Sequence, residues 1–297
     1  MSELAQRTAH VHARRGDLLS SWRFQRSAVA AAQHTVLVSA AVIILLPLFW
    51  TISTSLKEPT QVYAYPPEWL PSPARWSNYV EAMTVVPFLR FFANTALITV
   101  LNIVGQLLAC SLAAFAFARL RWWGRNTLFV LMISTMMLPY QVTLIPQFIL
   151  FRTLGWVNTF LPLIVPRLFA GAFYTFLMRQ FFMTIPAALD DAARIDGATT
   201  FGIYYRIILP MSKPVLMAVS IFVFNFSWNE FLMPLIYLSD QKNLTISLGL
   251  RSFQNLYSTQ WHLLMAASTV AMLPVILIFF VGQRYFIQGV VFSGVKG

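Results

Sequence analysis

Long runs of apolar residues, interrupted by short polar segments, dominate the chain. Four of these runs contain no charged residue and extend over about 20 positions or more, at 35–56, 91–118, 126–151 and 263–283. Two further runs carry one charge each, 158–178 with Arg167 and 214–239 with Glu230. Because about 20 apolar helical residues cross a hydrocarbon core, the pattern predicts six transmembrane helices.

The runs are continuous and do not alternate between apolar and polar positions, so helices are favoured over the strands of a membrane barrel. The composition agrees, since 58% of the residues are hydrophobic and 10% are charged, against about a quarter charged in soluble domains. We therefore expect an all-α integral membrane protein. The first run follows 34 residues and is longer than a signal core, so we expect it to be retained as a helix.

These positions predict the domain organisation of the chain. Residues 1–33 form a loosely ordered N-terminal arm, 34–56 the first transmembrane helix and 57–88 an extracytoplasmic loop. Residues 89–283 form a core of five transmembrane helices that includes a loop at 184–213, and 284–297 form a tail. Most Lys and Arg residues lie in both termini and in the loops on their side, which predicts that this side is cytoplasmic.

The net charge of +11 is interpreted as a signal of topology and of contact with anionic lipid. Nucleic-acid binding is not expected, because no segment is long enough for a soluble basic domain.

The loop at 57–88 contains Trp69 and Trp76, which suit the membrane interface. Pro139 and Pro146 favour a kink or break in the third run, either beside a transport pathway or as tolerated membrane prolines. The single cysteine, Cys110, is expected to pack in the apolar interior.

The most acidic passage in the second half of the chain is "LDDAARIDGATTFGIYYRIILP" at 189–210. We expect Thr184 to cap a helix through "AALDDAARI", Gly197 to end it in a left-handed conformation, and a second short helix to begin near Thr199. Its acidic residues keep this loop out of lipid. Its small residues would let another protein approach closely, although an ordinary solvated loop is the alternative.

The spacing of this passage resembles a known family. Asp191-Ala192-Ala193, three residues, Gly197, nine residues, Ile207, one residue and Leu209-Pro210 resemble the "EAA" loop of ABC importer permeases, with Asp191 in the Glu position. Asp196 and Ala198 complete the "EAA…DGA" form. The segments "FLMRQFFMTIPAALDDAARIDGA" and "QRYFIQGVVFSGVKG" resemble the carbohydrate, maltose-type class. The resemblance covers nearly all of the chain after residue 33.

This resemblance implies a type I ABC importer permease with six helices and both termini in the cytoplasm of a prokaryote. Such a chain pairs with a second homologous permease subunit, two ATPase subunits that bind ATP and Mg²⁺, and an extracytoplasmic solute-binding protein. The solute would be a sugar or oligosaccharide, moved by alternating access. The C-terminal tail would also approach the ATPase. The residues implied to couple the permease to the ATPase are Asp191, Ala192, Ala193, Asp196, Gly197, Ala198, Ile207, Leu209 and Pro210.

The chain itself is not expected to be an enzyme. "GATTFG" has the glycine spacing of a phosphate loop, but Ile203 and Tyr204 follow where Lys and Ser or Thr are required. Hydrolysis of ATP is therefore expected in a partner chain, and no cofactor or metal is expected on this one. Arg167 and Glu230 are too few ionisable residues for a membrane enzyme or a proton-coupled secondary transporter. A permease for another solute, such as glycerol phosphate or a peptide, is the nearer alternative.

The fifth run contains a polar cluster within "FVFNFSWNEF". The functional interpretation is a lining of the sugar pathway, and the alternative is hydrogen bonding to a neighbouring helix or subunit. Arg167 is expected to pair with Glu230 or, preferably, to extend toward the interface. The members of the cluster are Asn225, Ser227, Trp228, Asn229 and Glu230.

Overall fold

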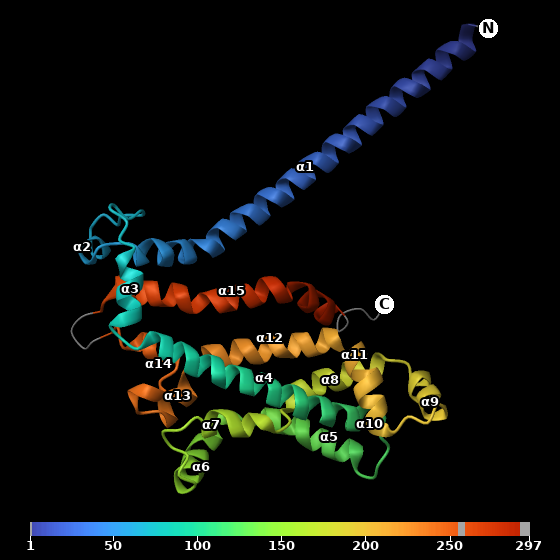
Figure 1. Ribbon diagram of the computed structural model, residues 1–297. Helices are drawn as coiled ribbons and strands as arrows, with labels where there is room; N and C mark the ends of the chain where they lie inside the picture. The colour runs from blue at the N-terminus through green and yellow to red at the C-terminus, as the bar shows by residue number, and fades with distance from the viewer. Residues whose placement is uncertain (1, 255–258, 292–297) are drawn as a thin grey trace.

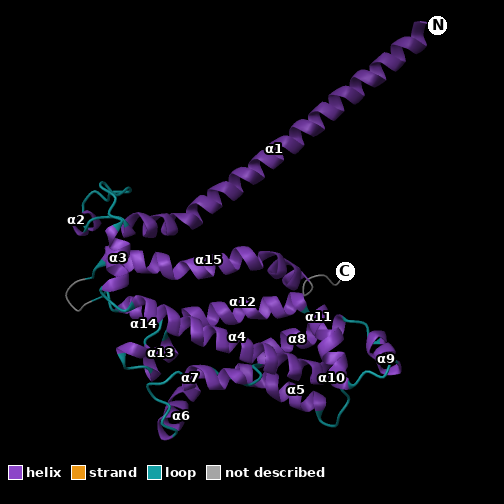
Figure 2. Cartoon of the chain, viewed as in Figure 1, coloured by secondary structure: helices purple, strands orange, loops and turns teal. Residues whose placement is uncertain are grey.

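The computed structural model describes residues 2–254 and 259–291, with side chains at 29–254 and 259–283. Within this part every regular element is a helix, as predicted (Figure 2). The α-helices are α1 (Ser2–Ser55), α2 (Pro59–Val62), α3 (Ser77–Thr84), α4 (Phe88–Arg119), α5 (Arg125–Ser134), α6 (Tyr140–Thr153), α7 (Leu161–Ile164), α8 (Ala172–Thr184), α9 (Ala188–Ile195), α10 (Thr200–Ile203), α11 (Leu209–Met211), α12 (Lys213–Asn229), α13 (Leu232–Tyr237), α14 (Ile246–Arg251) and α15 (Trp261–Val291). Three 3-10 helices, η1 (Thr135–Met137), η2 (Val165–Leu168) and η4 (Gln241–Asn243), and the π-helix η3 (Tyr204–Ile208) complete the set.

Six stretches of the described chain are candidate membrane spans, which confirms the predicted number when two bent pairs each count as one. The four without a sharp bend are Val29–Ser55, Phe88–Arg119, Leu161–Thr184 and Trp261–Gln283. The bent pairs are Arg125–Met137 with Tyr140–Thr153, at 95°, and Thr200–Met211 with Lys213–Asn229, at 77°.

The third predicted span is not one continuous helix. Pro139 separates η1 from α6, and Leu138 before it takes an extended conformation with ψ 114°. A residue that precedes proline is pushed out of the helical region, which explains the position of the bend. Pro146 lies inside α6, which continues through it. Of the two prolines, Pro139 therefore breaks the span.

Two other predicted spans are also irregular. The fourth extends to Thr184 instead of residue 178, and its backbone leaves the helix between η2 and α8. The fifth, predicted at 214–239, ends its main helix at Asn229, because Glu230 is extended with ψ 123° and α13 begins after it. Irregular backbone at membrane depth is tolerated where protein or a cavity satisfies its polar groups.

The N-terminal arm was expected to be loosely ordered, and the structure instead has α1 begin at Ser2. The arm has no proline and is rich in Ala, Arg, Leu and Gln, which favour helix. In Figure 1 α1 extends away from the other helices, and its last part lies against α15. Its exposed apolar side chains, such as Val36 and Ile44, are suited to lipid.

The core forms where α4 packs against α8 and α12, and where α12 packs against α15. One cluster gathers Phe88, Phe91 and Ala266 near α3 and α14, and another gathers Met178 and Phe182 near α9 and α10. Cys110 is fully buried in the second cluster, which confirms its predicted packing. In Figure 1 the 184–213 loop lies at one end of the bundle, and α2, α3, α6 and α13 lie at the other.

Candidate functional site

The 184–213 loop begins with α9, the helix predicted from "AALDDAARI". Thr184 does not cap this helix, contrary to the prediction. It is the last residue of α8, and its Oγ1 donates to the carbonyl of Phe181 at 2.7 Å. Helix α8 stops there because Ile185 precedes Pro186 and is extended. The chain then turns and restarts as α9 at Ala188.

Gly197 ends α9 in the left-handed conformation, with φ +81°, as predicted. The amide of Gly197 donates to the carbonyl of Arg194 at 3.0 Å, and the amide of Ala198 donates to that of Ala193 at 2.8 Å. This pair of bonds is a Schellman motif, which satisfies carbonyls at a helix end and favours glycine at this position. The turn directs the chain into α10, where Thr199 Oγ1 accepts the amide of Gly202 at 3.1 Å.

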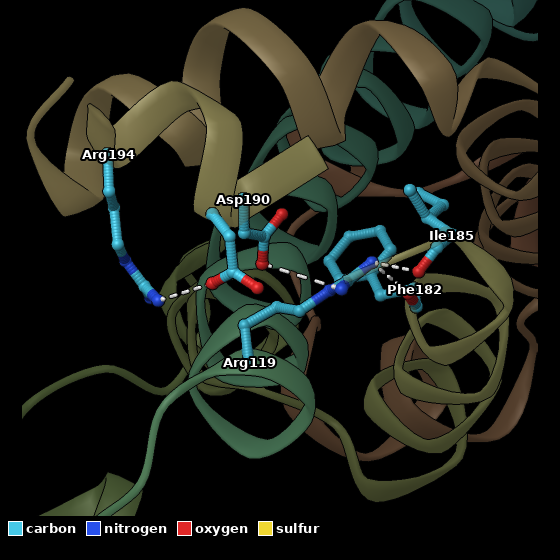
Figure 3. Close-up of polar contacts among 6 residues, drawn as sticks. Arg119, Phe182, Ile185, Asp190 and Arg194 are labelled. Atoms are coloured by element: carbon cyan, nitrogen blue, oxygen red, sulfur yellow. Dashed lines mark hydrogen bonds and ion pairs between the residues drawn. The ribbon is translucent and has the colours of Figure 1, made fainter. Parts of the chain in front are cut away.

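A buried ion pair joins α9 to the end of α4. Arg119 Nη1 lies 3.4 Å from Asp190 Oδ2, and each side chain is only 7% exposed. Figure 3 shows the two side chains pointing toward each other. Arg119 Nη2 also donates to the carbonyls of Phe182 and Ile185, at 2.7 and 2.6 Å, at the end of α8. The guanidinium of Arg119 therefore joins α4 to both α8 and α9.

Asp191, the acid that corresponds to the family Glu, points outward. It pairs with Arg194 at 3.4 Å on the exposed side of α9, where the Arg194 and Asp191 side chains are 52% and 71% exposed. The other predicted coupling residues are divided between the two sides of the loop. Ala193 is buried, Ala198, Ile207 and Leu209 are half-buried, and Ala192, Asp196, Gly197 and Pro210 are exposed.

The outer side of the same loop presents large apolar side chains. Ile195 is 87% exposed, Phe201 66% and Tyr205 63%. On the inner side, Tyr204 is buried and its hydroxyl lies 2.7 Å from Ser111 Oγ of α4. The loop thus has one side fixed to α4 and α8 and another side available to a partner.

A cavity of about 480 Å³ lies between the irregular segments and α4. Its walls come from α4, α6, η2, the start of α8, α12 and α13. The polar residues that line it include Thr95, Asn102, Gln106, Tyr140, Gln147, Arg167, Tyr174, Ser227, Glu230 and Tyr237. Its volume is that of a small-molecule site.

The structure places two of the five residues of the α12 polar cluster, Ser227 and Glu230, at this cavity. Trp228 is buried elsewhere, where it packs on Phe224 and donates its indole N–H to the carbonyl of Ala271 at 3.0 Å. Asn225 and Asn229 lie on an exposed side of α12, and their amide groups bond to each other at 2.9 Å. The helix therefore places residues that are close together in the sequence on different sides of α12.

Arg167 lines the cavity and does not form the ion pair with Glu230 that was one of its two expected arrangements. Its guanidinium carbon lies 4.4 Å from the ring centroid of Phe226, another lining residue. No ion pair joins it to Glu230 among the described residues. Glu230 Oε1 instead accepts the amides of Leu232 and Met233, at 3.1 and 3.3 Å, and caps the start of α13.

Sequence reasoning did not identify Asn102, Gln106 or the Arg119–Asp190 pair as site residues. Gln106 donates to the carbonyls of Arg167 and Phe169, which the break between η2 and α8 leaves without helical partners. The available signal was the presence of two amide side chains, four positions apart, in an otherwise apolar span. Amides at that spacing share one face of a helix.

Comparison with known proteins identifies the family. The family described as "Binding-protein-dependent transport system inner membrane component" matches residues 105–291, more than half of the chain. The chain belongs to this family. It is therefore a multi-pass inner-membrane component of a transport system, a permease subunit of the ABC importer type and not a catalytic subunit.

Similar permeases cover most of the chain. The probable ABC transporter permease protein YurM of Bacillus subtilis is 33% identical over 253 residues, 84% of this chain and 83% of YurM. The arabinooligosaccharides permease protein AraQ of Halalkalibacterium halodurans is 35% identical over 228 residues, 76% of this chain and 81% of AraQ. The sn-glycerol-3-phosphate permease protein UgpE of Brucella abortus is 33% identical over 267 residues, 87% of this chain and 94% of UgpE.

A solved structure shares the fold of this permease. A chain of a bacterial ABC transporter involved in the import of the acidic polysaccharide alginate superimposes with a TM-score of 0.77. The two are 24% identical, and the match covers 86% of this chain and 96% of the other. The type I importer permease fold implied by the sequence is thereby confirmed.

Proposed function

We propose that this chain is one of two homologous permease subunits of an ATP-driven importer. Together they would move a sugar, an oligosaccharide or a related polyol that an extracytoplasmic binding protein delivers. The observation that carries the proposal is the way α9 is held. A buried ion pair joins its inner side to α4, and its outer side leaves Asp191, Ala192 and Ile195 exposed. A loop that only connected two spans would need neither the anchor nor the apolar outer side.

In this proposal α9 docks on a partner ATPase at the cytoplasmic side, and the partner binds ATP and Mg²⁺. The exposed apolar residues Ile195 and Phe201 would enter a groove of the ATPase, and Asp191 would meet a polar or basic group at its rim. Closure of two ATPase subunits would displace α9. Because Arg119 bonds to both Asp190 and the end of α8, the displacement would reach α4 and α8 as a unit. Alternating access requires such a difference in contacts between two states.

The solute class is proposed from relatives together with the cavity. AraQ is named for arabinooligosaccharides and UgpE for sn-glycerol 3-phosphate. The cavity offers amide and hydroxyl groups of the kind that bind sugar hydroxyls, from Asn102, Gln147 and Tyr140. A glycerol phosphate is the second candidate solute. A secondary transporter is disfavoured, because Arg167 and Glu230 are the only described lining residues of the cavity with ionised side chains.

The test is a substitution at the end of α9. Gly197→Val should preserve assembly of the importer but reduce both ATPase stimulation by loaded binding protein and ATP-dependent uptake. Valine at φ +81° strains the backbone by about 1–2 kcal/mol. If this strain displaces the docking surface, we expect about a tenfold reduction in uptake and in ATPase stimulation. The complex would be purified with its partner subunits and reconstituted in proteoliposomes.

Gly155→Val is the matched control, because Gly155 also has positive φ, at +69°, and open space around it, but lies between α6 and α7. It should strain the backbone equally without affecting coupling. Unchanged uptake by Gly197→Val in an intact complex would count against docking at α9. Transport by a purified complex that lacks any ATPase would overturn the proposal.

A further inference from the structure

The cavity contains an arginine whose charge has no ion-pair partner in the described part of the chain. Among the described residues, the Arg167 guanidinium donates no hydrogen bond and forms no ion pair, and its one contact of this kind is with the Phe226 ring. A guanidinium has five N–H donors in a planar fork that matches carboxylate and phosphate oxygens. A charge at membrane depth is costly and faces a cavity or a partner. The ring contact compensates for part of this cost and supplies no acceptor.

The other ionised side chain at the cavity is already engaged. Oε1 of the Glu230 carboxylate accepts two backbone amides at the start of α13, where the helix end also favours a negative charge. Glu230 therefore has a structural role, whereas Arg167 has none in the described contacts. Because Glu230 is hydrogen-bonded and the Arg167 guanidinium, within the described residues, is not, the guanidinium can bind an anion in the cavity.

Two neutral groups at the cavity also lack partners. Asn102 Oδ1 and the hydroxyl of Tyr237 are buried and make no hydrogen bond to any described residue, although both residues line the cavity. Asn102 is 3% exposed and Tyr237 is 1% exposed. An acceptor and a hydroxyl without a hydrogen bond are costly when buried, but both atoms are covered by neighbouring side chains and are not open to the cavity.

We propose that Arg167 binds an anionic group of the transported solute, so that the solute is an acidic sugar or a phosphorylated sugar or polyol. The inference rests on the proposed function and narrows its solute class. A carboxylate and a phosphate present the same chemistry to the guanidinium, namely two oxygens for a bidentate contact.

The experiment uses the complete importer in proteoliposomes, with the binding protein present. Uptake and ATPase stimulation are measured with two matched pairs of solutes, galacturonate with galactose and glycerol 3-phosphate with glycerol. The first pair tests a carboxylate and the second tests a phosphate. The permease variants are Arg167→Gln, Arg167→Lys and, as control, Arg152→Gln, which changes an exposed arginine at the end of α6.

An anionic member of one pair should stimulate ATPase activity and be taken up in preference to its neutral counterpart. Arg167→Gln should reduce that uptake about ten- to a hundredfold, the loss expected for a hydrogen bond to a charged group. Arg167→Lys should retain part of it because the charge remains, and Arg152→Gln should have no effect. Uptake of any neutral solute should not fall in Arg167→Gln.

The inference is overturned if the importer takes up a neutral member in preference to its anionic counterpart, or if Arg167→Gln leaves anionic uptake unchanged. A carboxylate of the partner permease could instead pair with Arg167. In that case Arg167→Gln would lower neutral and anionic uptake equally and weaken assembly, which also overturns the inference. Failure of the proposed function differs, since the wild-type complex would then take up no solute in an ATP-dependent manner.

Discussion

Asp190→Ala should destabilise the permease far more than the same change at its neighbour Asp191. Asp190 faces Arg119 in a site where both side chains are 7% exposed, so its removal leaves a buried cation. The Arg119 guanidinium would keep only two neutral carbonyl partners, on Phe182 and Ile185. Breaking a buried ion pair in this way costs about 3–5 kcal/mol.

Asp191→Ala is the control because the N–O distance of its ion pair is the same and its burial differs. Asp191 and Arg194 are also 3.4 Å apart, but their side chains are 71% and 52% exposed. Exposed pairs contribute about 0.2–1 kcal/mol, since water screens them and competes for both charges. The two substitutions should therefore differ by about 2 kcal/mol or more in the free energy of unfolding.

The assay is unfolding of the purified permease in mixed micelles by increasing SDS, followed by tryptophan fluorescence. A double-mutant cycle with Asp190→Ala, Arg119→Met and both together measures the interaction directly. The double variant should be more stable than the sum of the two single losses predicts, because it leaves no unpaired charge buried. Equal costs for the Asp190 and Asp191 variants, or additivity within about 0.5 kcal/mol, would refute the reasoning.

Two further predictions concern packing and protonation. Gly249→Ala should cost about 1–3 kcal/mol of unfolding free energy in the same assay, because its Cβ would overlap the ring of the buried Phe91. A change below about 0.5 kcal/mol would contradict this prediction. Burial lowers the pKa of Lys57 although Glu68 opposes the shift, so the folded state loses its proton before the unfolded state does. The stability of the folded state should therefore rise with pH between that lowered pKa and 10.5. A pH series of thermal unfolding midpoints should show this rise in the wild type and not in Lys57→Met. A rise that persists in Lys57→Met would mean that another group causes it.

The number and order of the membrane segments were predictable because hydrocarbon burial requires long apolar runs, which the sequence displays directly. The breaks were only partly predictable. The break at Pro139 is predictable from the proline itself. The break between η2 and α8 is stabilised by Gln106, which donates a hydrogen bond to the carbonyl of Phe169, 63 positions away in the sequence. A local pattern contains no information on such a distant partner.

The 184–213 loop shows a similar division. The helix and Gly197 follow from local rules, and both are present. The roles of two adjacent aspartates do not follow, because helical phase decides which of them is buried. Asp190 shares its face with Ala193, three positions on, and both are buried, whereas Asp191 lies on the opposite side.

Helix α4 connects the two parts of the candidate site. It runs without a break from Phe88 to Arg119, about 48 Å at 1.5 Å per residue. Asn102 and Gln106 contact the cavity from its middle, and Arg119 holds α9 at its end. Gln106 also bonds to the break that carries Arg167. A displacement of α9 that keeps its ion pair intact must move α4, and a tilt of α4 must change the walls of the cavity. We therefore expect the bonds made by Arg119 and Gln106 to link the movements of the two ends, so that loss of the Arg119 bonds should reduce transport although Arg119 does not line the cavity.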